Sequence, residues 1–170
     1  ACHIRVADET TFYALPEGSR GIFVGGGGGV RIPRLIGAAR MTDMVLTRRF
    51  DAEATSLQRQ GELGLWASLL GQEAAQVGSC RAMRPDDYAF PTYREHGVSW
   101  CRGVDPLNLL GMFRGVNHGG WDPNENNFGL YTIVIGAQTL HATGYAMGMQ
   151  RDGVVGTGDP ERDSAAVGHF

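Results

Sequence analysis

The stretch YTIVIGAQTLHATGYAMGMQ, residues 131–150, decides the fold class. Its first five residues, Tyr131 to Ile135, predict a short buried strand, because they form an apolar, β-branched run. From Gly136 to Gln150 small residues recur at helical spacing. They predict a helix that packs closely on a sheet or on another helix. A strand followed by such a helix is typical of the α/β class.

The sequence around this stretch predicts further helices and strands. An amphipathic helix is expected from Asp43, with Gly61 ending it and an apolar stripe formed by Leu46, Phe50, Ala54 and Leu57. The other expected helices are residues 72–83, residues 95–102 and a helix that begins at Asp105-Pro106, where aspartate suits the cap and proline the first turn. Residues 88–93 should be extended, residues 114–129 and 154–163 should be loops, and residues 165–170 should begin another strand.

Residues 1–40 are expected to form an irregular, glycine-rich lead-in. The run Gly25 to Gly29 follows a possible strand, which is also how a dinucleotide-binding loop begins. The spacing of the glycines does not fit a dinucleotide-binding loop, because Val30 stands where the third glycine belongs and Pro33 stands where the binding helix should already have begun. A flexible linker is therefore the favoured interpretation.

Composition excludes several classes of function. Hydrophobic residues make up 42% and charged residues 19%, and the net charge is −3 with both signs interspersed, which is typical of a globular chain that does not bind nucleic acid. No apolar run is long enough for a membrane span, and no leader peptide opens the sequence, so a cytoplasmic protein is expected. All 15 basic residues are arginine, so neither a Walker A loop nor a pyridoxal Schiff base can be built from this sequence. Cys2, Cys80 and Cys101 are scattered and are expected to be reduced.

The segment Pro91-Thr92-Tyr93-Arg94-Glu95-His96-Gly97 carries the clearest chemistry. At the start of a helix, Arg94 could hold phosphate oxygens, and the Tyr93 hydroxyl could donate one more hydrogen bond. His96 is a candidate catalytic residue. Without other information, a Tyr-Arg pair in this position is more often structural, and a histidine is more often a buried or capping residue.

Four blocks occur in order: LLGQEAAQVGS (69–79), DDYAFPTYREHG (86–97), CRGVDP (101–106) and IGAQTLHATGYAMG (135–148). Over residues 43–150 this order and spacing resemble the alpha subunits of the thiamin-diphosphate-dependent pyruvate and branched-chain 2-oxo acid dehydrogenases. The resemblance implies that residues 41–170 are the N-terminal part of a thiamin-diphosphate-binding domain. Its expected fold is α/β, a parallel sheet flanked by helices and incomplete at the C-terminus.

The resemblance also implies roles for individual residues. Tyr93 and Arg94 would contact the diphosphate of thiamin diphosphate, and Ile133 and Ile135 would line its aminopyrimidine. Gln138 falls where some branched-chain members bind a monovalent cation. The family's magnesium ligands belong to a Gly-Asp-Gly motif and a later asparagine, both expected beyond Phe170. We therefore expect no magnesium ligand in this sequence, and poor cofactor binding and no activity from the chain alone.

The implied function is oxidative decarboxylation of a 2-oxo acid with transfer of the acyl group to a lipoyl arm. The implied partners are a beta subunit, in a heterotetramer, and the lipoyl-bearing acyltransferase component. Pyruvate and branched-chain substrates both stay open. Two positions depart from the pyruvate-type members: Ala67 replaces a histidine, and Trp121-Asp122-Pro123 replaces a Ser-Met-His stretch. The alternative is a non-catalytic fragment or subunit-pairing module that binds no cofactor.

Overall fold

The computed structural model describes residues 28–159 and 161–169. The chain divides into two compact units, residues 1–42 and residues 43–170. All the candidate site residues lie in the second unit. None of the described helices is long and apolar enough to cross a membrane.

The described part of the first unit is helical. Helix α1 spans Gly28–Ile36 and α2 begins at Ala38, so the prediction of an irregular segment is wrong for residues 28–40. Glycine and proline disfavour helix, but α1 accommodates Pro33 in its interior, and glycine stands at its start and directly after its end. Gly37 ends α1 at a φ of 87°, a conformation that glycine adopts without steric cost, and donates its N–H to the Pro33 carbonyl at 2.8 Å. Residues 25–27 of the glycine run lie outside the described residues.

The helices predicted for the second unit are confirmed. They are the part of α2 from Asp43 to Arg59, α3 (Glu73–Ala82), α4 (His96–Cys101), α5 (Pro106–Arg114) and α7 (Ala137–Arg151). A short helix, α6 (Pro123–Asn126), interrupts the loop that was expected over residues 114–129. Cys80 and Cys101 are free thiols, as expected.

Helix α5 shows how local chemistry sets the helix ends. The Asp105 carboxylate accepts the N–H of Leu107 at 2.9 Å, and Pro106 occupies the first turn, where its missing N–H costs nothing. At the other end Gly115 adopts a φ of 82° and closes the helix.

Helices α3 and α4 pack closely because α4 carries a glycine at the contact. The Gly97 N–H donates to Oε1 of Gln76 at 2.9 Å. A Cβ at Gly97 would lie 3.1 Å from the Gln76 side chain and 3.3 Å from Cγ2 of Thr47, so any larger residue would push the helices apart.

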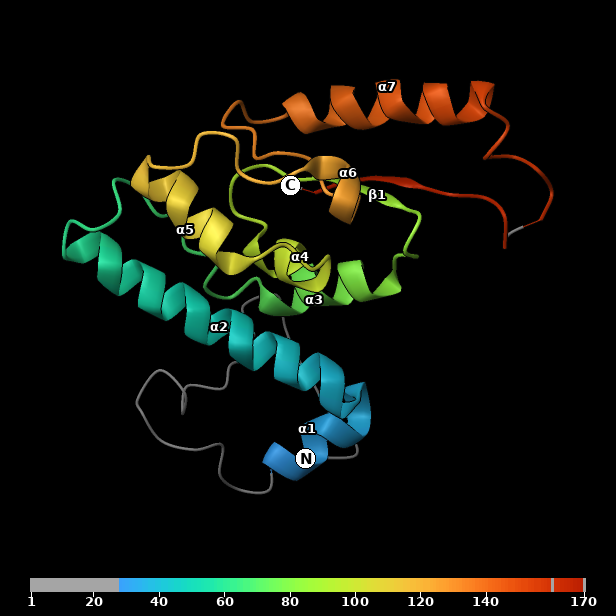
Figure 1. Ribbon diagram of the computed structural model, residues 1–170. Helices are drawn as coiled ribbons and strands as arrows, with labels where there is room; N and C mark the ends of the chain where they lie inside the picture. The colour runs from blue at the N-terminus through green and yellow to red at the C-terminus, as the bar shows by residue number, and fades with distance from the viewer. Residues whose placement is uncertain (1–27, 160, 170) are drawn as a thin grey trace. The chain divides into compact units, whose positions relative to one another are not determined.

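The two described strands form a small parallel sheet. Strand β1 (Tyr88–Phe90) pairs with β2 (Ala166–Gly168) in the register Tyr88↔Ala166, Ala89↔Val167 and Phe90↔Gly168. Helix α7 packs against both strands, with α3 and α4 on their other side (Figure 1). A Cβ at Gly168 would lie 3.9 Å from Cβ of Ala142 on α7, so small residues do allow the close approach that the sequence predicts. This helix-rich arrangement with a parallel sheet is compatible with a partial α/β fold.

The segment Tyr131–Ile135 is not the buried strand that its composition predicts. No strand forms there, and Ile133, Val134 and Ile135 are 64%, 70% and 77% exposed. The segment is tied instead to the loop after β1, because the Thr132 N–H donates to the Thr92 carbonyl at 2.8 Å. An apolar run becomes a buried strand only where neighbouring elements cover it, and among the described residues nothing covers these three.

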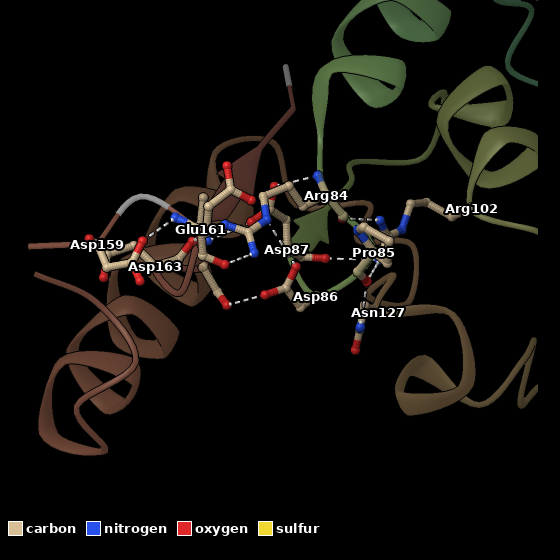
Figure 2. Close-up of polar contacts among 11 residues, drawn as sticks. Arg84, Pro85, Asp86, Asp87, Arg102, Asn127, Asp159, Glu161 and Asp163 are labelled. Carbon is tan, nitrogen blue, oxygen red and sulfur yellow. Dashed lines mark hydrogen bonds and ion pairs between the residues drawn. The ribbon is translucent and has the colours of Figure 1, made fainter. Parts of the chain in front are cut away.

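A polar clamp holds the two strands in register (Figure 2). The Asp87 carboxylate accepts the N–H groups of Arg84 and Ala165, each at 2.7 Å, which ties the turn before β1 to the residue before β2. The Arg84 guanidinium donates to the carbonyls of Glu161 and Asp163 in the preceding loop. These contacts place the starts of β1 and β2 side by side, and the parallel pairing therefore places their carboxyl ends side by side as well.

Candidate functional site

The candidate site lies at the carboxyl edge of the two strands. Beyond β1 the chain enters Pro91–Arg94, and beyond β2 the His169 N–H donates to the Phe90 carbonyl at 2.9 Å. Ligands of open parallel sheets bind outside the carboxyl ends of the strands, because loops from neighbouring strands converge there.

Tyr93 and Ile133 line the same pocket, of about 430 Å³. The structure thus brings together two residues that the sequence predicted to serve one ligand. The rest of the lining is largely apolar: Gly64, Leu65, Met112, Phe113, Arg114, Gly115 and Tyr131. Such a lining, with polar groups at a few points, is typical of a small-molecule site.

Arg94 is held beside this pocket by a backbone oxygen. Its Nη1 donates to the Ser68 carbonyl at 2.7 Å, and its Cζ lies 5.7 Å from the centre of the Tyr93 ring. A guanidinium has five N–H donors, so this one bond orients the group and leaves other donors for an anion.

The loop that carries Tyr93 and Arg94 is fixed by Glu95. This buried carboxylate accepts the Thr92 N–H at 2.7 Å, the Thr92 hydroxyl at 2.6 Å and the Arg94 N–H at 3.2 Å. From α3, Nε2 of Gln76 donates to the Arg94 carbonyl at 3.1 Å. The backbone at Arg94 is therefore ordered before any ligand arrives.

His96 is buried, only 1% exposed, and both of its ring nitrogens have partners. Nε2 lies 2.8 Å from the Ala67 carbonyl and Nδ1 lies 2.8 Å from the Tyr131 hydroxyl. Because a carbonyl can only accept, Nε2 carries the proton and Nδ1 accepts from Tyr131. Burial lowers the pKa of His96 to about 4, so the ring is neutral at pH 7. The catalytic role predicted for His96 stays a prediction, and the geometry supports a packing role.

Ile135 and Gln138 lie apart from the pocket lining. The Ile135 side chain points into solvent rather than lining the pocket. Gln138 is buried on α7, where its Nε2 donates to the His169 carbonyl at 2.9 Å and its Oε1 is buried with no hydrogen-bond partner. An unpaired buried oxygen of this kind fits a cation ligand.

Sequence reasoning missed the buried hydrogen-bond network of Asp51, Trp66 and Ser68, in which the Ser68 carbonyl accepts the hydrogen bond from Arg94. The Asp51 carboxylate, on α2, accepts hydrogen bonds from both of the other side chains. The predicted stripe of Leu46, Phe50, Ala54 and Leu57 did not point to Asp51, because the buried face of α2 is formed by Asp43, Thr47, Asp51 and Ala54, and Leu46 is exposed. A carboxylate on that face needs hydrogen-bond partners.

Over the described ranges, residues 28–159 and 161–169, no group of three or more His, Cys, Asp or Glu side chains could hold a metal ion.

Comparison with known proteins gives the family. The family described as "Dehydrogenase E1 component" matches residues 41–159. The chain belongs to this family. Within the matched E1 region lie Asp51, the Tyr93-Arg94 loop and all of the residues that line the pocket.

Three relatives show the range of the similarity. The 3-methyl-2-oxobutanoate dehydrogenase subunit alpha of Mycobacterium tuberculosis is 47% identical over 108 residues, which cover 64% of this chain and 29% of the relative. The pyruvate dehydrogenase E1 component subunit alpha of Bacillus subtilis is 34% identical over 113 residues, and that of Staphylococcus aureus is 39% identical over 114 residues. Both of these alignments cover 66% of this chain and 30% of the relative. The chain thus spans about three-tenths of the length of these relatives.

Proposed function

We propose that this chain is part of the alpha subunit of a thiamin-diphosphate-dependent 2-oxo acid dehydrogenase. Its reaction would be oxidative decarboxylation of a 2-oxo acid, with the acyl group passed to a lipoyl group. The observation that carries the proposal is the placement of Tyr93 and Arg94 beside a largely apolar pocket at the carboxyl edge of two parallel strands. Membership of the E1 family supports it.

The residues present fit the two ends of thiamin diphosphate. When bound, this cofactor supplies the carbanion that attacks the 2-oxo group and the electron sink for decarboxylation. The free N–H donors of Arg94 and the Tyr93 hydroxyl would hold the diphosphate oxygens through charge-assisted hydrogen bonds. The Ile133 side chain would form an apolar wall against the aminopyrimidine and exclude water there.

The proposal extends to partners and ions. Ile135, exposed beside Ile133, would face the cofactor once a beta subunit supplies the opposite wall. A magnesium ion would accompany the diphosphate and take its ligands from groups other than the described residues. Gln138 Oε1 is the candidate ligand for a monovalent cation. The acyl group would pass to a lipoyl-bearing acyltransferase.

We propose a branched-chain 2-oxo acid rather than pyruvate as the substrate. The relative named for 3-methyl-2-oxobutanoate is more similar to this chain than the relatives named for pyruvate, with 47% against 34% and 39% identity. Ala67 and Trp121 also stand at positions where the chain departs from the pyruvate type. We expect kcat/KM for 3-methyl-2-oxobutanoate to exceed that for pyruvate at least tenfold in the assembled enzyme. The reverse order would contradict this assignment.

Substitution of Arg94 tests the cofactor site. In the full-length subunit assembled with its partner, Arg94→Ala removes one or two charge-assisted bonds, each contributing roughly 1.5–3 kcal/mol. The dissociation constant of thiamin diphosphate with magnesium should therefore rise at least tenfold, measured by isothermal titration calorimetry. Arg49→Ala is the matched control, because Arg49 is exposed and pairs only with Glu53 on its own helix among the described residues. The dissociation constant of thiamin diphosphate should not change in Arg49→Ala.

If the constant of Arg94→Ala also stays unchanged while the protein remains folded, the cofactor assignment is wrong. A subunit-pairing module without cofactor binding would then be the better description.

A further inference from the structure

We infer that Asp51 is a positioning residue for Arg94 and sets the direction in which its guanidinium meets the diphosphate. This inference rests on the proposed function. Asp51 lies on α2, 43 positions before Arg94 in the sequence, and the two side chains make no direct contact among those described. Instead, both side chains form hydrogen bonds with the peptide unit between Ser68 and Leu69: Asp51 with its N–H and Arg94 with its carbonyl.

The Asp51 carboxylate is fully engaged within the fold. It is 2% exposed and accepts three hydrogen bonds from the loop between α2 and α3. Its Oδ1 accepts the Trp66 indole N–H at 2.9 Å and the Leu69 N–H at 3.0 Å, and its Oδ2 accepts the Ser68 hydroxyl at 2.7 Å. A buried carboxylate with three donors fixes the loop that supplies them.

The peptide unit between Ser68 and Leu69 transmits this order to Arg94. Its N–H donates to Asp51, and its carbonyl accepts Nη1 of Arg94 at 2.7 Å. The described chain has no cis peptide bond, and in a planar trans peptide the N–H and the C=O point in opposite directions. Asp51 therefore turns this carbonyl toward Arg94. Hydrogen bonds at both ends of one peptide also polarise each other, which strengthens the contact with the guanidinium.

The Asp51 contact should change the affinity of the site for the cofactor without changing the charge of Arg94. An arginine whose guanidinium is already oriented loses less side-chain entropy when it binds the diphosphate. Without the Asp51 contact the 68–69 peptide can rotate, and Arg94 loses its anchor while keeping its charge. The site would then bind the cofactor more weakly with every direct ligand still present.

The test uses the full-length subunit assembled with its partner, with thiamin diphosphate and magnesium as the probe. Asp51→Ala should raise the dissociation constant about tenfold in the wild-type background and leave it unchanged in the Arg94→Ala background. This non-additivity is the signature of action through Arg94. Asp51→Asn keeps an acceptor for the Leu69 N–H, so it should bind within about threefold of wild type.

Trp66→Phe is the matched control for a merely structural effect. It removes one hydrogen bond from Asp51 without touching the 68–69 peptide, so it should lower the melting temperature and leave the dissociation constant unchanged. If Asp51→Ala does not fold, Asp51→Glu keeps the charge but displaces the acceptor by one methylene. It should show the same non-additivity with Arg94→Ala.

The outcomes separate the two ideas. An unchanged constant in Arg94→Ala alone overturns the proposed function. If Arg94→Ala raises the dissociation constant of thiamin diphosphate, the proposed function stands. The positioning role of Asp51 is then overturned by either of two results: the Asp51 variants leave this constant unchanged, or they raise it equally in the wild-type and Arg94→Ala backgrounds.

Discussion

At the scale of single residues, His96 shows how surroundings decide what a side chain can do. Its ring stacks on Trp66, with the ring centres 4.2 Å apart, and its two nitrogens bind a backbone carbonyl and the Tyr131 hydroxyl. The same burial raises the pKa of Tyr131 well above its usual value, so both partners stay neutral. The pair links the loop between α2 and α3 to the segment that begins at Tyr131.

This burial predicts a pH dependence of stability. The pKa of His96 is lowered from 6.5 to about 4 in the folded protein, so between these values the unfolded chain binds the proton and the folded chain does not. His96 should therefore contribute its full stability above pH 6.5 and lose about 3 kcal/mol as the pH falls to 4. The measurement is urea unfolding at several pH values. His96→Gln should show a shallower decline, and identical pH profiles for the two proteins would contradict the prediction.

At the scale of elements, Arg102 joins three segments through backbone oxygens alone. From the end of α4, its guanidinium donates to the carbonyls of Arg84, Pro85 and Asp87 and to that of Asn126 at the end of α6, each at 2.9 Å. Figure 2 shows Arg102 beside Arg84, Pro85 and Asp87, the residues of the turn before β1 whose carbonyl oxygens it binds. A lysine could not reproduce this set, because it lacks the planar fork of donors.

We expect Arg102→Met to lower the free energy of unfolding by about 2–4 kcal/mol, because four backbone carbonyls each lose a hydrogen bond from a charged donor. Arg49→Met removes an equally long cation from an exposed pair on one helix and should cost less than about 1 kcal/mol. Denaturant unfolding of both variants gives the comparison. Equal losses would mean that the Arg102 contacts contribute no more than an ordinary surface pair.

At the scale of the whole molecule, apolar side chains on the second unit are not covered by the described residues. Besides Ile133, Val134 and Ile135, they include Leu140 and Met147 on α7, which are 76% and 56% exposed. Exposed apolar surface of this kind favours association. In the proposed complex a beta subunit would cover it.

We expect the 170-residue chain to self-associate, and Val134→Asn with Ile135→Asn to reduce this association. Because both side chains are already exposed, the free energy of unfolding should change by less than about 0.5 kcal/mol. Sedimentation velocity at increasing protein concentration is the measurement. A chain that is already monomeric at all concentrations, or a double variant that associates as strongly as wild type, would contradict the prediction.

Features that depend on near neighbours along the chain follow from the amino-acid sequence. Helix ends follow from residues within one turn, as the Asp105 cap with Pro106 and the glycine at position 115 show. The stripe of Leu46, Phe50, Ala54 and Leu57 predicted α2, and the order of four short blocks predicted the family. These signals are local or are read as patterns, so no tertiary contact is needed to find them.

Tertiary structure alone decided what covers each segment and which distant groups meet. The run from Tyr131 to Ile135 is apolar enough for a strand, but burial requires a neighbouring element, and its sequence says nothing about one. The peptide at Ser68 and Leu69 joins Asp51, 18 positions before Leu69, to Arg94, 26 positions after Ser68. Periodicity reaches only a few residues along a helix. A carboxylate, a peptide and a guanidinium this far apart in sequence meet only when the chain folds.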